Sequence, residues 1–134
     1  MEELSIEARV ENADAVIDFV DAHLWDCPQK IRNQVGIAVD EIFSNIARHA
    51  YHPATGGATV RVAVGPDAVV VEFEDSGVAY DPLSTPAPDL TLPAEERELG
   101  GLGIFMVRNL MDSAEYRREG NRNILTIRKH LAQP

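Results

Sequence analysis

Three short clusters in this chain could support chemistry, and the first lies in a stretch with helical spacing. Glu41, Asn45 and His49 are four residues apart, so they fall on one stripe of a helix. The stripe borders an apolar one, where a carboxylate and an amide are costly unless they bind a ligand or satisfy the backbone. Taken alone, the same spacing also fits a solvated helix face, and both interpretations stay open here.

The second cluster is the sequence Asp75-Ser76-Gly77, which follows directly after a valine-rich strand. A carboxylate at a strand end, followed by a glycine that lets a ligand come close, can accept a hydrogen bond from an amino group. The N6 amine of adenine is a donor of this kind. An Asp-Ser-Gly turn without a ligand is the ordinary alternative for such a sequence.

The third cluster is the GGLG run at residues 100–103, which opens a predicted helix. Glycines there let the backbone approach a ligand, and the free N–H groups of a helix N-terminus favour a phosphate. The run is a weak signal by itself. The Gly-Lys-Ser/Thr pattern of a P-loop is absent and the elements are not wound as βαβ units, which excludes Walker-type and Rossmann nucleotide sites.

Hydrophobic patterns predict the elements that must position these clusters. Alternation or valine-rich runs predict strands at residues 4–10, 58–64, 68–74, 114–118 and 124–129. Helical spacing predicts helices at residues 13–25, 29–51 and 104–111. This order predicts an α+β fold, a two-layer sandwich in which three helices cover one face of a mixed, mostly antiparallel sheet.

One long segment interrupts the pattern. From residue 76 to about residue 99 no hydrophobic period is sustained, and half of the chain's eight prolines fall there. A loop of this length in a compact domain is usually functional or disordered. We therefore expect residues 1–134 to form a single domain with a lid loop over about residues 76–101, which is mobile without ligand.

Composition narrows the possible partners. The chain has 12 lysines and arginines against 22 aspartates and glutamates, a formal net charge of −10. Such a chain repels nucleic acid and anionic lipid, so neither nucleic acid nor a membrane is an expected partner. The single Cys27 forms no internal disulfide or cysteine-rich zinc site, and the N-terminus lacks signal-peptide features, so we expect a cytoplasmic protein. Trp25 and the four phenylalanines are expected in the core.

Together the three clusters are far more specific than any one of them. Glu-x-x-x-Asn on a helix, Asp-x-Gly after a strand and Gly-x-Gly at a helix start resemble the N, G1 and G2 boxes of the GHKL ATP-binding superfamily. The sequences at Asp75–Pro82 and Gly101–Asp112 resemble its short stand-alone branch, the anti-sigma-factor serine/threonine kinases of bacterial partner-switching systems. Asn123–Ile127 resembles the family's last strand. The resemblance extends to about Lys129 and implies a Bergerat-type ATP-binding fold.

The resemblance implies a role for each matching residue, with ATP and Mg²⁺ as cofactors. Asn45 would bind Mg²⁺ through its amide oxygen, because Mg²⁺ keeps waters and takes its other ligands from phosphates. Glu41, one turn away, would be the catalytic residue that orients or deprotonates the attacking hydroxyl. Asp75 would accept a hydrogen bond from the adenine amine, with Gly77 making room for the ring and Thr126 helping through its hydroxyl.

Two glycines and two basic residues complete the implied site. Gly101 and Gly103 would let the lid backbone cradle the phosphates. His49 and Arg97 would contact phosphate, although His49 fits a helix-capping role equally well and Arg97 that of a solvated lid residue. The family's first glycine box often ends in a second glycine, where this chain has Ala79, and the added Cβ restricts the backbone there.

The resemblance therefore implies an ATP-dependent serine/threonine protein kinase of the anti-sigma-factor type. It would phosphorylate a small antagonist protein, sequester a sigma factor or another regulator, and form homodimers through the exposed side of the sheet. Ala79 motivates an alternative, a non-catalytic module that binds ATP and switches partners without chemistry. A third interpretation is an α+β interaction protein that binds no nucleotide.

Overall fold

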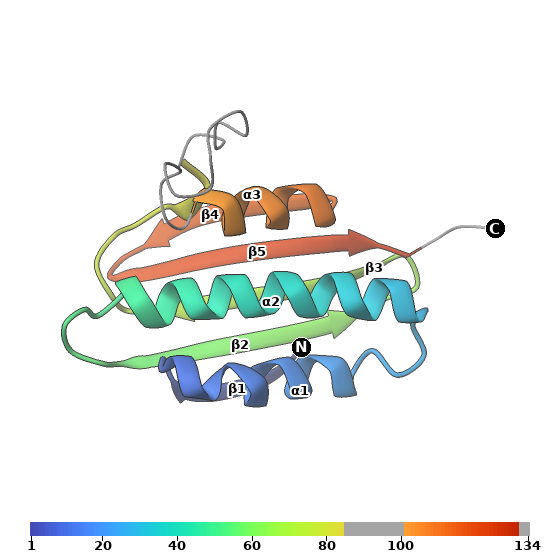
Figure 1. Ribbon diagram of the computed structural model, residues 1–134, viewed down its shortest axis with the longest axis horizontal. Helices are drawn as coiled ribbons and strands as arrows, with labels where there is room; N and C mark the ends of the chain where they lie inside the picture. Colours follow the sequence, from blue (N-terminus) through green and yellow to red (C-terminus); the bar gives the residue numbers. More distant parts are fainter. Residues whose placement is uncertain (85–100, 132–134) are drawn as a thin grey trace.

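The computed structural model describes residues 1–84 and 101–131, and it is a two-layer α+β sandwich (Figure 1). The strands are β1 (Glu2–Glu7), β2 (Gly57–Val64), β3 (Ala68–Asp75), β4 (Ser113–Glu119) and β5 (Arg122–His130). The helices are α1 (Ala13–Ala22), α2 (Gln29–His49) and α3 (Gly101–Leu110), with short 3-10 turns at Val10–Asn12 and Pro82–Ser84. These bounds confirm the predicted order of elements. No helix in the described part of the chain is long and apolar enough to span a bilayer.

The sheet has the strand order β1-β2-β3-β5-β4, and its four pairings are all antiparallel. The sequence predicted a mixed, mostly antiparallel sheet. β3 and β4 do run in the same direction, since each is antiparallel to β5. No parallel contact forms between them because β5 lies in the middle. The long connection through α3 therefore carries the chain from a central strand to the edge of the sheet.

The core lies between the sheet and α2, which runs across the middle of the helix layer (Figure 1). Apolar residues recur every three or four positions on α2, and alternate residues of β2, β3 and β5 face them. Phe43 of α2 and Phe73 of β3 are fully buried in this layer. Burying such side chains is the main favourable contribution to folding, at roughly 2–3 kcal/mol each.

An ion pair links α1 to α2. Arg32 of α2 donates two hydrogen bonds to Asp21 of α1, with Nε–Oδ1 and Nη2–Oδ2 distances of 2.9 and 2.6 Å. These bonds hold the pKa of Asp21 below its usual value. Because both side chains are partly open to water, the pair orients α1 on α2 more than it stabilises the fold.

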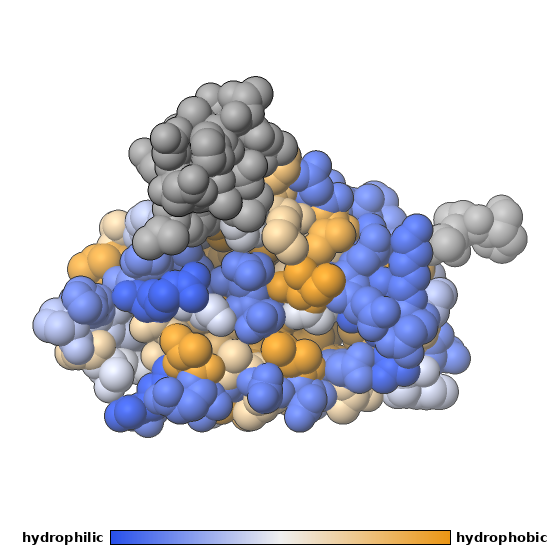
Figure 2. Space-filling model, viewed as in Figure 1, coloured by the Kyte–Doolittle hydropathy of each residue, from blue (hydrophilic) through white to orange (hydrophobic). Residues whose placement is uncertain are grey.

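The opposite face of the sheet carries no helix and is lined by charged side chains. Arg61 of β2 lies at its centre and contacts Glu3, Glu72 and Glu74, at distances of 3.0, 3.0 and 3.2 Å. The helix side of the molecule differs, since Figure 2 shows apolar patches there between mainly polar residues. The two faces of the sheet are therefore chemically distinct, and a residue's parity along a strand decides which environment it meets.

The expected core position of Trp25 is wrong. The helix predicted for residues 13–25 ends at Ala22, so Trp25 lies in the turn beyond it and is 75% exposed. Phe43 and Phe73 are buried as expected, while Phe19 and Phe105 are half-buried. Helical spacing alone did not show where the apolar face of α1 stops contacting the sheet.

The packing of α2 generates a prediction about stability. Replacing Phe43 with alanine leaves a cavity between α2 and the sheet, so we expect the free energy of unfolding to fall by about 3–5 kcal/mol. Ile37→Ala on the same helix is the matched control. Because Ile37 is 43% exposed, this substitution should lower the free energy of unfolding by less than about 1 kcal/mol. Urea denaturation measures both. Equal losses in the two variants would contradict this account of the core.

Candidate functional site

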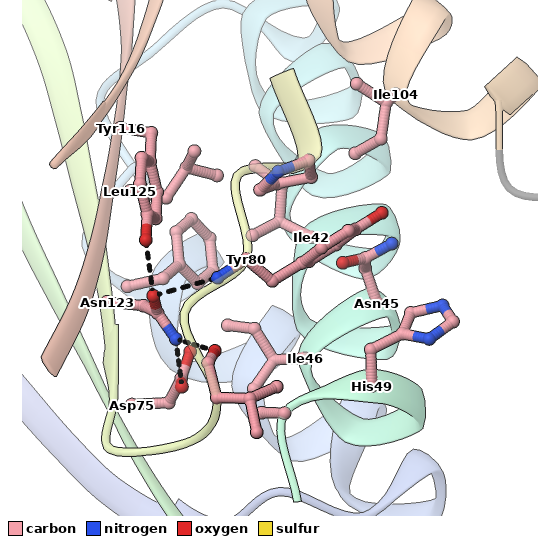
Figure 3. Close-up of a pocket in the computed structure, with 14 residues that line it drawn as sticks. Ile42, Asn45, Ile46, His49, Asp75, Tyr80, Ile104, Tyr116, Asn123 and Leu125 are labelled. Carbon is pink, nitrogen blue, oxygen red and sulfur yellow. Dashed lines mark hydrogen bonds between the residues drawn. The ribbon is translucent and has the colours of Figure 1, made fainter. Parts of the chain in front are cut away.

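A pocket opens where the C-terminal part of α2 meets the ends of β3 and β5 (Figure 3). Three of the predicted site residues line it, namely Asn45, His49 and Asp75. The rest of its wall is largely apolar and includes Ile42, Phe73, Ile104 and Leu125 among others. An apolar pocket with a few convergent polar groups is the usual form of a small-molecule site.

The pocket is narrow in its interior. It contains about 430 Å³ of empty space measured out to open solvent, but only about 30 Å³ of its interior is accessible to water. The unfilled interior is too small for a purine, which therefore enters only if side chains at the mouth move. Tyr80, which is 40% exposed, lies at that mouth against His49, with 5.7 Å between ring centroids.

Asp75 is buried at the end of β3 because strand alternation places it on the same face as Phe73. Its Oδ1 accepts hydrogen bonds from Gly77 N and Asn123 Nδ2, each at 2.9 Å. Its Oδ2 has no hydrogen-bond partner among the described residues, yet it is not sealed from solvent. One carboxylate oxygen is therefore free to accept a hydrogen bond from a ligand in the pocket.

Asn45 is the second buried polar group in the pocket, with 6% of its surface exposed. It makes no hydrogen bond to any other described residue, although its amide is not sealed from solvent. Because solvent reaches the amide, its polar atoms are available to a ligand in the pocket. His49, one turn further along α2, is exposed and lines the mouth.

Glu41 lies one turn before Asn45, outside the lining of this pocket and next to the start of α3. A Cβ on Gly103 would come within 2.1 Å of Glu41 Oε2, so the missing side chain lets the two helices approach. Gly101 is the first residue of α3, and Gly103 lies in its first turn. The structure therefore brings Glu41 to the helix N-terminus at which phosphates were expected. Arg97 lies outside the described residues.

Two predicted residues have positions that differ from expectation. Gly77 is not in the pocket wall, and a Cβ on it would lie 2.1 Å from the Ala50 carbonyl oxygen, so it lets the turn pack against the end of α2. Thr126 pairs with Glu72 and Glu115, and this register places it on the helix-free face of the sheet. It cannot reach the pocket, because residues of even number in β5 point away from the helices.

Asn123 is the site residue that sequence reasoning missed. It is buried, lies directly opposite Asp75 in the β3–β5 register and lines the pocket. Parity could have identified it, since Leu125 and Ile127 are the apolar core residues of β5 and Asn123 shares their face. The backbone at Ala79 has no positive φ, like that of every other described non-glycine residue, so the structure accommodates the Cβ there.

Asn45 fits a Mg²⁺ ion whose other ligands are phosphate and water oxygens. Within the described ranges, no three His, Cys, Asp or Glu side chains form a cluster that could hold a metal by themselves. Cys27 packs against the core, and burial raises the pKa of its thiol, so the thiolate needed for nucleophilic chemistry is disfavoured.

Several known proteins resemble this chain in sequence. The serine/threonine-protein kinase BtrW of Bordetella bronchiseptica is 31% identical over 106 residues, which cover 77% of this chain and 73% of BtrW. The serine-protein kinase RsbW of Listeria monocytogenes is 33% identical over 97 residues, covering 67% of this chain and 61% of that protein. RsbW of Bacillus cereus is 28% identical over 93 residues, covering 66% of this chain and 58% of that protein.

Solved structures of histidine kinases share the fold. AdeS of Acinetobacter baumannii aligns with a TM-score of 0.55 at 15% identity, covering 99% of this chain and 69% of AdeS. The histidine kinase domain of the Erythrobacter litoralis EL346 blue-light activated kinase aligns with a TM-score of 0.51 at 22% identity, covering 78% of this chain and 46% of that domain. Residues 6–129 match the model of one family over nearly the whole chain, and the protein belongs to the histidine kinase-like ATPase domain family.

Proposed function

We propose that this protein is an ATP- and Mg²⁺-dependent serine/threonine protein kinase of the anti-sigma-factor type. The observation that carries the proposal is that Asn45 and Asp75, from separate elements, are buried in one pocket with polar atoms that no described residue satisfies. These atoms keep contact with solvent, so they are available to hydrogen-bond a ligand that enters the pocket. The relatives BtrW and RsbW are named serine/threonine- or serine-protein kinases, which favours phosphoryl transfer over other ATP chemistry.

The chemistry of the lining suggests how ATP would lie. The Oδ2 atom of Asp75 would accept a hydrogen bond from the adenine amine, while the apolar side chains of the pocket would contact the purine ring. The phosphates would then extend along α2 toward the first turn of α3, where Gly101 and Gly103 lie at the helix N-terminus. Asn45 lies along that path and would hold Mg²⁺, which supplies neutralising charge to the phosphate oxygens when bound.

Glu41 is proposed as the group that handles the proton of the protein substrate. A serine or threonine hydroxyl attacks the γ-phosphorus, forming the new O–P bond while the bond to the leaving oxygen of ADP breaks. Glu41 orients that hydroxyl and accepts its proton. Its carboxylate lies against Gly103, so the start of α3 fixes its position beside the expected γ-phosphate.

The partners follow from the same proposal. The phosphorylated substrate is a small anti-sigma-factor antagonist, and the second partner is a sigma factor or another regulator that the protein sequesters. The chain forms a homodimer through the helix-free face of the sheet, whose arginine and glutamate pairs can rearrange across a two-fold axis. Light scattering tests the dimer.

Phosphate transfer is the direct test. The full chain is mixed with radiolabelled Mg²⁺-ATP and, in turn, the small proteins encoded by neighbouring genes, and labelled serine or threonine is sought in the product. We expect one of these proteins to be labelled. Calorimetry with Mg²⁺-ATP runs in parallel. Binding without transfer would replace the kinase by a non-catalytic ATP-responsive module, and the absence of binding would leave an interaction protein without a nucleotide.

The proposed role of Glu41 predicts a separation of binding from chemistry. Glu41→Gln keeps the shape of the side chain but cannot take a proton, so transfer should fall by at least about 100-fold. Because Glu41 lies outside the pocket lining, the calorimetric Kd for Mg²⁺-ATP should change less than about threefold. Glu2→Gln, at an exposed strand position, is the control. Full transfer by the Glu41 variant would exclude it as the base.

Gly103 provides a second, independent test of the same geometry. In Gly103→Ala the new methyl group forces the Glu41 carboxylate to move, and a flexible side chain can do so at little cost to the fold. We expect transfer to fall at least about tenfold through misplacement of Glu41, while the free energy of unfolding changes by less than about 1 kcal/mol. Gly57→Ala is the control, since its Cβ meets nothing within 4 Å. A loss of folded protein large enough to account for the lost transfer would argue against this role of Gly103 in positioning Glu41.

A further inference from the structure

Asn123 lies at the centre of a hydrogen-bond network that ends at the pocket. It is 6% exposed and sits opposite Asp75 in the β3–β5 pair. Its Nδ2 donates to Asp75 Oδ1 at 2.9 Å and to the Val78 carbonyl oxygen at 2.8 Å. Both N–H bonds of the amide are therefore used, and none is left to donate to a ligand.

The other side of the Asn123 amide is equally occupied (Figure 3). Its Oδ1 accepts from the Tyr116 hydroxyl at 2.6 Å, from Arg118 Nη1 at 3.1 Å and from the Tyr80 backbone N–H at 3.4 Å. A flipped amide would turn its NH₂ toward two obligatory donors, Arg118 and the Tyr80 N–H, and its oxygen toward the Asp75 carboxylate. The network therefore fixes one orientation of the amide.

The same residues also hold the backbone that follows Asp75. Arg118 Nη1 donates to the Gly77 carbonyl oxygen at 2.9 Å, and Val78 N donates to the Ala50 carbonyl oxygen at 3.0 Å. The turn after β3 is thus tied to the β4–β5 hairpin on one side and to the end of α2 on the other. Asp75 cannot rotate without breaking bonds to both Gly77 and Asn123.

We infer that Asn123 and Arg118 are positioning residues that lock the Asp75 carboxylate with one oxygen facing the pocket, and so make the site selective for 6-aminopurines over 6-oxopurines. The inference rests on the proposed function, in which Asp75 contacts the base. A fixed carboxylate oxygen accepts from an amine but repels the carbonyl oxygen of hypoxanthine. A mobile carboxylate would lose its hydrogen bond to the amine and could turn away from the carbonyl oxygen. Selectivity therefore depends on the hydrogen bonds that hold Asp75 in place.

The test compares the Kd values of Mg²⁺-ATP and Mg²⁺-ITP by calorimetry. The unmodified chain should prefer ATP by at least about tenfold. Arg118→Gln and Asn123→Asp should raise the Kd of ATP by about tenfold and leave the Kd of ITP nearly unchanged. The ratio of the ITP Kd to the ATP Kd therefore falls. Arg128→Gln and Asn121→Asp are matched controls at exposed positions, and they should keep the original ratio.

A pH series adds a readout that a structural role would not move. In Asn123→Asp a second carboxylate faces Asp75, and two such groups share a proton more readily as the pH falls. ATP binding by this variant should therefore strengthen from pH 8 to pH 6 relative to the unmodified chain, while Asn121→Asp should follow the unmodified chain. A pH profile of Asn123→Asp that is parallel to the unmodified chain would overturn the proposed contact.

The remaining outcomes separate this inference from the proposed function. If the Arg118 and Asn123 variants bind ATP and ITP more weakly by the same factor, the network is merely structural and the inference is overturned. An unmodified chain that binds ATP and ITP equally would overturn it while leaving ATP binding intact. An unmodified chain that binds neither would overturn the proposed function as well. Arg118 is exposed, so its variant keeps the test decisive if Asn123→Asp does not fold.

Discussion

The hydrogen bond between Asp75 and Asn123 is the interaction on which the site depends. Both residues lie on the inner face of the sheet next to apolar residues of β3 and β5, and the antiparallel register places them directly opposite each other. A carboxylate in such a place is tolerated only when it is hydrogen-bonded. Here one oxygen is satisfied internally and the other is left to the pocket. The sheet thus creates a polar end to an otherwise apolar core.

The distance between this polar end and α2 is set by the backbone. Gly77 lets the turn after β3 touch the Ala50 carbonyl, and Val78 N donates to that same oxygen. The last turn of α2 and the end of β3 therefore form one unit. Since a helix is rigid over a few residues, Asn45 is placed relative to Asp75 with little freedom. The apolar packing of α2 on the sheet supplies the free energy that holds two under-satisfied polar groups in this arrangement.

The elements, the fold class and the α2 residues could be predicted because they depend on local periodicity. Glu41, Asn45 and His49 lie on one stripe of any helix that contains them. Their relative positions therefore do not depend on the exact residues at which the helix begins and ends. The resemblance assigned Thr126 to the adenine site, but strand parity places it on the helix-free face, because neighbouring residues of a strand point to opposite faces. Asn123 was missed because its importance lies in a cross-strand contact with a residue 48 positions away. Strand parity indicates that Asn123 faces the core, but a single sequence gives no register that would place it opposite Asp75.

In the proposed kinase, the residues for recognition and for chemistry would lie at different positions along α2. Asn45 and His49 face a pocket whose far wall includes the hydrogen-bonded Asp75 and Asn123 of the central strands, whereas Glu41 faces the first turn of α3. In the proposed kinase, ATP affinity would then depend mainly on the sheet, which is rigid, and transfer would depend on where α3 begins. That start follows directly after the predicted lid. A partner or nucleotide that shifts the first turn of α3 would therefore change the confinement of Glu41 and alter the rate of transfer while leaving the base-binding contacts in place.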